Sequence, residues 1–137
     1  MCAVTNSAGY SGTPQLKKLG ISAGVRLAVV GAPDGWAFES RPEGVEAVDE
    51  GAPADAVLLF VRTPDDVRAG IPRLGESIRP AGALWVAWPR KAAGHASDVT
   101  ENLLRDVALP LGLVDVKVAA IDTDWSGLKI VWRKELR

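Results

Sequence analysis

The sequence predicts an α/β fold, a three-layer sandwich in which a mainly parallel sheet is covered by helices and ends in an antiparallel hairpin. Three observations lead to this prediction. Short apolar runs rich in valine are typical of strands buried on both faces. Between these runs lie segments with helix caps and a helical spacing of apolar residues. Near the end of the chain, a strand with alternating residues precedes a tight turn and a further strand.

The first elements follow in order along the chain. After an N-terminal arm over residues 1–12, we expect one α/β domain over residues 13–137, since this length suits a single core. A short helix begins with Thr13 as N-cap and Pro14 in its first turn, and Gly20 is its C-cap. Buried strands are expected over residues 25–30, 56–61 and 83–88, with a weaker strand over residues 45–48.

Two longer helices and the hairpin complete the expected elements. Thr63 caps a helix in which Pro64 and two aspartates form the first turn, and Pro72 predicts a kink or a split. Asp98 and Glu101 form a capping pair for a helix that runs to about Ala108. The hairpin is expected over residues 114–120 and 128–132. One face of the Thr63 helix carries Val67, Ile71, Leu74 and Ile78.

Composition excludes several classes of protein. The chain has 137 residues, 16 lysines and arginines and 17 aspartates and glutamates, so its formal net charge is −1, which argues against nucleic-acid binding. One cysteine and one histidine cannot build a zinc cluster or an internal disulfide, so no metal site is expected. Neither a signal segment nor a membrane span is apparent. We therefore expect a cytoplasmic protein.

Two segments resemble the Rossmann-like fold of S-adenosylmethionine-dependent methyltransferases. Residues 19–31 (L-G-I-S-A-G-V-R-L-A-V-V-G) resemble the lead-in and first strand of that superfamily, and residues 78–86 (I-R-P-A-G-A-L-W-V) resemble its entry to a later strand. The terminal hairpin also matches that fold. The resemblance implies a cofactor site in which a carboxylate at the tip of the second strand holds the ribose hydroxyls, a place where Asp49 stands.

The loop that carries the cofactor chemistry departs from the superfamily pattern. Val29 stands where an acidic residue is usual, and residues 31–35 read G-A-P-D-G instead of G-x-G-x-G. Pro33 replaces the middle glycine, which removes an N–H donor and fixes φ. The segment from this loop to the next strand is also too short for a full crossover helix.

The whole chain also resembles a family of small bacterial proteins known as domain of unknown function 3052. The matching residues are G-Y-S-G-T-P over 9–14, L-W-V-A-W-P-R-K over 84–91, T-E-N over 100–102 and D-W-S-G-L-K over 124–129. This resemblance implies no activity and names no cofactor.

A candidate binding site lies where the parallel strands end, because ligands of open parallel sheets bind outside their carboxyl ends. Cations and an aromatic side chain at this edge suit a small anionic or nucleotide-like ligand. Alternatively, the cations are solvated or pair with Asp34, Asp49, Glu50 and Asp65, as surface charges commonly do. The candidate ligand-binding residues are Gly31, Asp49, Arg62, Trp88, Arg90 and Lys91.

Other residues allow more than one interpretation. Residues 9–14 resemble a phosphate-binding turn without the lysine of a P-loop, and a capped arm is the alternative. His95 suits a general acid or base, although no nucleophile motif accompanies it. Trp85 and Trp88 lie on opposite faces of their strand because they are an odd number of residues apart. Trp132, expected on an edge strand, is the candidate for an interface.

Three hypotheses follow. The first is a non-catalytic protein that binds a small anionic ligand or a protein partner at the carboxyl edge of its sheet. The second is an S-adenosylmethionine-dependent methyltransferase with a divergent cofactor loop. The third is a structural module that forms a homodimer through its terminal hairpin.

Overall fold

A computed structural model describes residues 14–95 and 97–137, and these form a six-stranded sheet with the order β2-β1-β3-β4-β6-β5. Neighbours among the first four strands are parallel, whereas β6 is antiparallel to both β4 and β5. The α/β fold with a C-terminal antiparallel hairpin is therefore confirmed. The strands are β1 (Arg26–Val30), β2 (Glu46–Ala47), β3 (Ala56–Phe60), β4 (Ala83–Pro89), β5 (Leu113–Ala120) and β6 (Trp125–Trp132).

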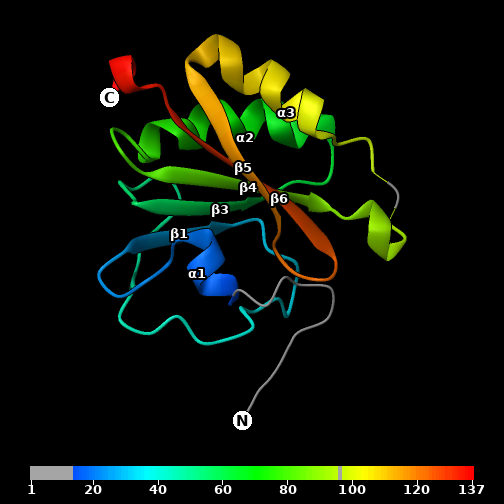
Figure 1. Ribbon diagram of the computed structural model, residues 1–137, viewed down its shortest axis with the longest axis horizontal. Helices are drawn as coiled ribbons and strands as arrows, with labels where there is room; N and C mark the ends of the chain where they lie inside the picture. The colour runs from blue at the N-terminus through cyan, green and yellow to red at the C-terminus, as the bar shows by residue number, and fades with distance from the viewer. Residues whose placement is uncertain (1–13, 96) are drawn as a thin grey trace.

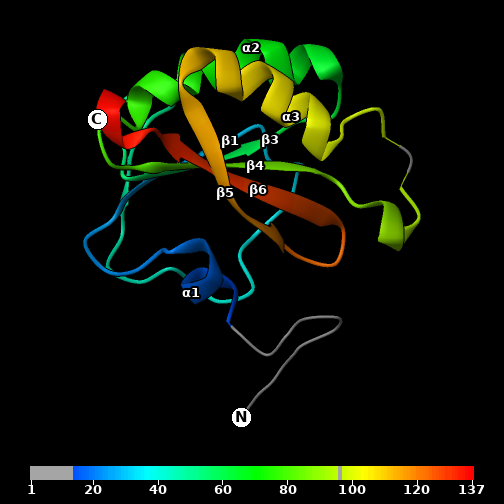
Figure 2. The ribbon, with the colours of Figure 1, turned by 45° about the horizontal axis from the view of Figure 1, so that its top comes forward.

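The helices lie on both faces of this sheet. Figures 1 and 2 show α2 (Pro64–Ser77) and α3 (Glu101–Ala108) side by side on one face and α1 (Gln15–Leu19) on the other. Short 3-10 turns follow β4, α3 and β6 over Lys91–Ala93, Leu109–Leu111 and Lys134–Leu136. The expected three layers are present, but the α1 layer is thin because residues 31–45 contain no helix.

Helix α2 forms as its sequence predicts. The Thr63 hydroxyl accepts a hydrogen bond from the Asp66 N–H, and the Asp66 carboxylate accepts one from the Thr63 N–H, which makes a complete capping box. The helix continues through Pro72, so the expected split does not occur. Pro72 is exposed, and so is Arg68, the residue four positions earlier whose carbonyl loses its usual helical hydrogen bond. All four predicted apolar positions of α2 are fully buried.

The ends of the shorter helices correct two details. Thr100, not Asp98, is the N-cap of α3, and its hydroxyl accepts a hydrogen bond from the Leu103 N–H. Gly20 ends α1 with φ +75°, as expected for a left-handed C-cap. Pro14, expected in the first turn of α1, is instead its N-cap residue. Thr13, the N-terminal arm and the rest of the segment at residues 9–14 lie outside the described residues.

The tryptophans of the sheet are buried. Trp85 and Trp88 lie on opposite faces, as predicted, in the α1-side and the α2-side cores respectively. Trp132 is not an interface residue: it is 4% exposed, and its indole N–H donates to the Gly75 carbonyl at 2.8 Å. Its strand β6 lies inside the sheet, and β5 is the edge strand. The register of β5 against β6 shifts between Asp115 and Lys117, which marks a bulge at Val116.

Candidate functional site

The carboxyl ends of β1 and β3 meet at the point where the strand order reverses, because β1 connects to β2 on one side and pairs with β3 on the other. Gly31 follows β1 with φ +75°, and a Cβ there would lie 2.9 Å from the Phe60 carbonyl oxygen. Arg62, just beyond β3, donates from Nη1 to the Gly31 carbonyl at 3.2 Å. Gly31 and Arg62 are therefore brought together at the topological switch point, where parallel sheets bind ligands.

A row of aromatic rings lies beside this point. The Trp36 and Phe60 ring centroids are 4.9 Å apart, as are those of Phe60 and Trp125, and both pairs pack edge to face. The Arg62 guanidinium lies 5.5 Å from the Trp125 ring centroid. Sequence reasoning missed Trp36 and Phe60 as parts of the site. Trp36 directly follows Gly35, the last glycine of the turn, and that position was the available signal.

Asp49 lies beyond the end of β2 in a turn, where its carbonyl accepts a hydrogen bond from the Ala52 N–H at 3.0 Å. Its side chain is exposed and, within residues 14–95 and 97–137, its carboxylate makes no hydrogen bond or ion pair. The structure thus places Asp49 at the same edge as Gly31 without joining it to Gly31 or Arg62. Its carboxylate is free to accept hydrogen bonds from a ligand.

The candidate residues at and after the end of β4 lie in different environments. Trp88 is 7% exposed and packs in the core beneath α2 and α3, so its ring offers no face to a ligand. The expectation for Trp88 is corrected: strand alternation turns its side chain away from the α1 side. Arg90 and Lys91 follow the strand, and no described residue pairs with either side chain by a hydrogen bond or salt bridge. Of the sequence-based alternatives, pairing with the nearby acids does not apply to these two cations, whereas solvation remains compatible with the half-buried Arg90 and the exposed Lys91.

Arg90 acts electrostatically on the α1 side of the sheet. Burial lowers the pKa of the Lys18 ammonium below its usual range, although the Glu39 carboxylate opposes this effect. The positive charges of Lys117 and Arg90 lower the pKa of Lys18 further. Arg90 therefore shares a cationic region with Lys18 and Lys117, whereas Arg62 belongs to the switch point between β1 and β3.

His95 lies in the loop after β4, where its Nε2 is 3.0 Å from Asp124 Oδ1. The Arg90 N–H donates to the Asp124 carbonyl at 2.9 Å, so two contacts fasten this loop to the β5–β6 turn. Both side chains of the His95–Asp124 pair are exposed. In the described parts of the chain no nucleophilic side chain contacts the His95 imidazole, so the structure adds no catalytic partner to it.

Neither a metal-binding cluster nor a membrane-spanning helix occurs within residues 14–95 and 97–137. These residues contain no cluster of three or more histidine, cysteine or acidic side chains that would hold a metal ion. Among their helices, none combines the length and the hydropathy that crossing a bilayer requires.

Comparison with known proteins points to one fold. No protein-family model and no curated protein sequence matches the chain. Among solved structures, magnesium protoporphyrin IX methyltransferase from Synechocystis PCC 6803, with S-adenosylmethionine bound, superposes with a TM-score of 0.58 at 12% identity, over 87% of this chain and 74% of that one. A methyltransferase from Aquifex aeolicus gives 0.55 at 14%, over 84% and 86%.

A third structure, fibrillarin from Aeropyrum pernix with natively bound S-adenosyl-L-methionine, gives a TM-score of 0.52 at 15% identity, over 81% of this chain and 68% of that one. At such low sequence identity, these superpositions establish a shared architecture and do not establish a shared activity. The chain has the Rossmann-like fold of the S-adenosylmethionine-dependent methyltransferases.

Proposed function

We propose that this protein binds an S-adenosyl cofactor at the carboxyl edge of its sheet and is an S-adenosylmethionine-dependent methyltransferase with a divergent cofactor loop. One observation carries the proposal: Gly31 makes a left-handed turn at the end of β1, at the switch point of a sheet whose structural neighbours bind this cofactor. The fold supports the location of the site. Whether an S-adenosyl cofactor fits there depends on the side chains at the carboxyl edge of the sheet.

The residues at the edge fit an S-adenosyl group at two of its polar ends. The unpaired Asp49 carboxylate suits the ribose hydroxyls, which donate hydrogen bonds to such an acceptor. The Arg62 guanidinium suits the carboxylate of the methionine part, since arginine pairs with carboxylates in a fixed planar geometry. S-adenosylmethionine, when bound, supplies an electrophilic methyl group, and this chain's residues hold and orient it.

The loop after β1 departs from this pattern at Pro33. Its backbone has no N–H to donate to the cofactor, and the Pro33 carbonyl is used internally because it accepts a hydrogen bond from the Trp36 N–H at 3.0 Å. We therefore expect weaker cofactor binding than in a protein with glycine at this place.

A second candidate function is non-catalytic binding of a small anionic or nucleotide-like ligand, or of a protein partner, at the same edge. The observation that favours it is the Arg62–Gly31 hydrogen bond, which occupies the switch point, together with the unpaired side chains of Arg90 and Lys91. Membership of domain of unknown function 3052 and a cytoplasmic location are further proposals, supported by the sequence resemblance and composition alone.

Calorimetric titration with S-adenosylhomocysteine tests the first function. We expect binding, and Asp49→Asn should weaken it about tenfold or more, because a charge-assisted hydrogen bond contributes roughly 1.5–3 kcal/mol. Asp106→Asn on α3, which also removes one exposed carboxylate, is the control and should leave the affinity unchanged. Absence of binding would contradict the cofactor proposal. Binding of a nucleotide or a phosphate ester instead would support the second function.

A further inference from the structure

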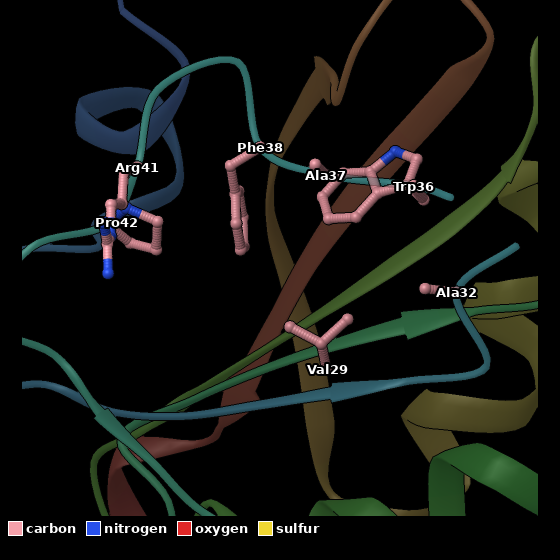
Figure 3. A pocket seen from close by; sticks show the side chains of 7 residues that line it. All are labelled: Val29, Ala32, Trp36, Ala37, Phe38, Arg41 and Pro42. Atoms are coloured by element: carbon pink, nitrogen blue, oxygen red, sulfur yellow. The ribbon is translucent and has the colours of Figure 1, made fainter. Parts of the chain in front are cut away.

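A cavity of about 440 Å³ lies between β1 and the loop that follows it. Figure 3 shows Val29 pointing from β1 toward Phe38, with Trp36 near one end and Arg41 and Pro42 at the other. We call this space the β1 cavity. It lies over the α1-side face of the sheet, and its end at Ala32 and Trp36 adjoins the proposed cofactor site at the carboxyl edge.

The β1 cavity exists because the connection from β1 to β2 lacks a helix. Strand β1 has a neighbour on each side, yet Val29 remains 40% exposed. The loop covers this part of the sheet mainly with Trp36 and Phe38, which pack edge to face with ring centroids 4.9 Å apart and planes inclined by 71°. Apolar surface that the protein's own side chains leave open favours an apolar ligand.

The wall of the β1 cavity is fixed in place. The Trp36 indole N–H donates to the Asp122 carboxylate at 2.8 Å, and the Trp36 ring packs edge to face on Phe60. The Glu39 N–H donates to the buried Gln15 side chain at 2.8 Å, which holds the loop between Phe38 and Arg41. A cavity whose walls are tied to three other segments is pre-formed, and this lowers the cost of ordering when a ligand binds.

One charged side chain lines the β1 cavity. Arg41 has no hydrogen bond or ion pair with any residue of the described ranges 14–95 and 97–137. Glu39 and Glu43, the acids nearest in sequence, do not line the cavity. An apolar space with a single unpaired guanidinium at one end complements a ligand that is apolar at one end and anionic at the other.

We propose that the β1 cavity binds a small planar aromatic carboxylic acid. The ring of the acid lies between Val29 and the Trp36 and Phe38 rings, and its carboxylate pairs with Arg41. A volume of about 440 Å³ is at the lower end of the range for ligand pockets, which suits a compound of one or two rings. This proposal does not depend on cofactor binding at the carboxyl edge.

Titration with 2-naphthoate and its uncharged analogue 2-naphthamide tests the proposal. We expect 2-naphthoate to bind and to change tryptophan fluorescence, and 2-naphthamide to bind about tenfold more weakly, the difference of about 1.4 kcal/mol that one favourable ion pair supplies. Arg41→Gln should remove this difference. Arg133→Gln, which removes an exposed arginine after β6, is the charge-matched control and should preserve it.

A second variant tests the location. Val29→Phe places a ring in the β1 cavity and should abolish binding of both compounds without lowering the melting temperature, because the new ring fills open space. Failure of 2-naphthoate to bind at about 1 mM, a threshold near −4 kcal/mol, would overturn the proposal. Equal affinities of the unmodified protein and the Arg41→Gln variant would overturn the role of the charge. S-adenosylhomocysteine takes no part in these titrations, so their failure is distinct from failure of the proposed function.

Discussion

Gln15 joins three segments that are far apart in the sequence. Its side chain is 3% exposed, its Nε2 donates to the Ile121 carbonyl at 2.6 Å, and its Oε1 accepts from the Glu39 N–H at 2.8 Å. Buried polar groups need such partners because leaving them unpaired costs free energy. One side chain therefore fixes α1, the loop after β1 and the end of the β5 region relative to one another.

Gln15→Leu should destabilise the protein by about 1–3 kcal/mol, since it keeps the volume but leaves the Glu39 N–H and the Ile121 carbonyl without their partner. Urea unfolding at neutral pH measures this change. Lys17→Leu, an exposed position on the same helix, is the control and should change the free energy of unfolding by no more than about 0.5 kcal/mol. Equal stability of the Gln15→Leu and unmodified proteins would contradict the structural role of Gln15.

At the scale of the elements, the loop over residues 31–35 decides how the carboxyl edge binds ligands. Pro33→Gly restores a backbone N–H and frees φ, so it should raise the affinity for S-adenosylhomocysteine several-fold, the effect of about one added hydrogen bond. Calorimetry of the variant beside the unmodified protein measures this. Pro42→Gly, in the same β1–β2 connection but away from the turn over residues 31–35, is the control and should leave this affinity unchanged. An unchanged affinity after Pro33→Gly would place the ligand elsewhere.

Local sequence signals were sufficient for most elements. The apolar runs identified β1, β3 and β4 to within about a residue, and the capping box identified the start of α2. The spacing of Asp98 and Glu101, three residues apart, predicts a capping pair that begins α3 at Asp98, which is wrong by two residues. Only the backbone geometry shows that Thr100 has the extended conformation and the hydrogen bond of the cap.

The candidate site was only partly predictable. That Gly31 and Arg62 adjoin follows from parallel strands ending at one edge, and the structure joins them. Trp88 was misplaced because the odd spacing from Trp85 predicts opposite faces for the two rings but not which face each ring takes, and Trp88 takes the α2-side core. Trp36 was missed because its partner Asp122 is 86 residues away, and no local pattern reveals a contact over such a distance.

At the scale of the whole molecule, charged contacts hold neighbouring elements together. Hydrogen bonds from the Arg26 side chain lower the pKa of the Asp55 carboxyl below its ordinary value of 3.8, and those from Arg105 do the same for Asp115. The N–H of Arg62 is the largest cause that lowers the pKa of Asp66. These pairs connect β1 with the start of β3, α3 with β5, and the end of β3 with α2.

The folded protein should therefore lose stability in acid. Because the pKa values of these carboxyls are lower in the folded than in the unfolded chain, their contribution is complete above about pH 5 and is lost as the pH falls through and below 3.8. Urea unfolding from pH 7 to pH 3 measures this decrease. Asp115→Asn should be less stable at pH 7 and should depend less steeply on pH, whereas the control Asp106→Asn should follow the unmodified protein. If the free energy of unfolding depended on pH equally steeply in all three proteins, the role of Asp115 would be contradicted.

The bulge in β5 affects whether another β-strand can pair with this edge of the sheet. Val116 and Val118 are 55% and 49% exposed on this edge strand, a combination that invites another strand to pair with it. The register shift between Asp115 and Lys117 interrupts the row of backbone donors and acceptors on which an added strand depends. The same irregularity that bends β5 therefore protects the sheet against growth into an aggregate, because an incoming strand loses alignment after a few residues.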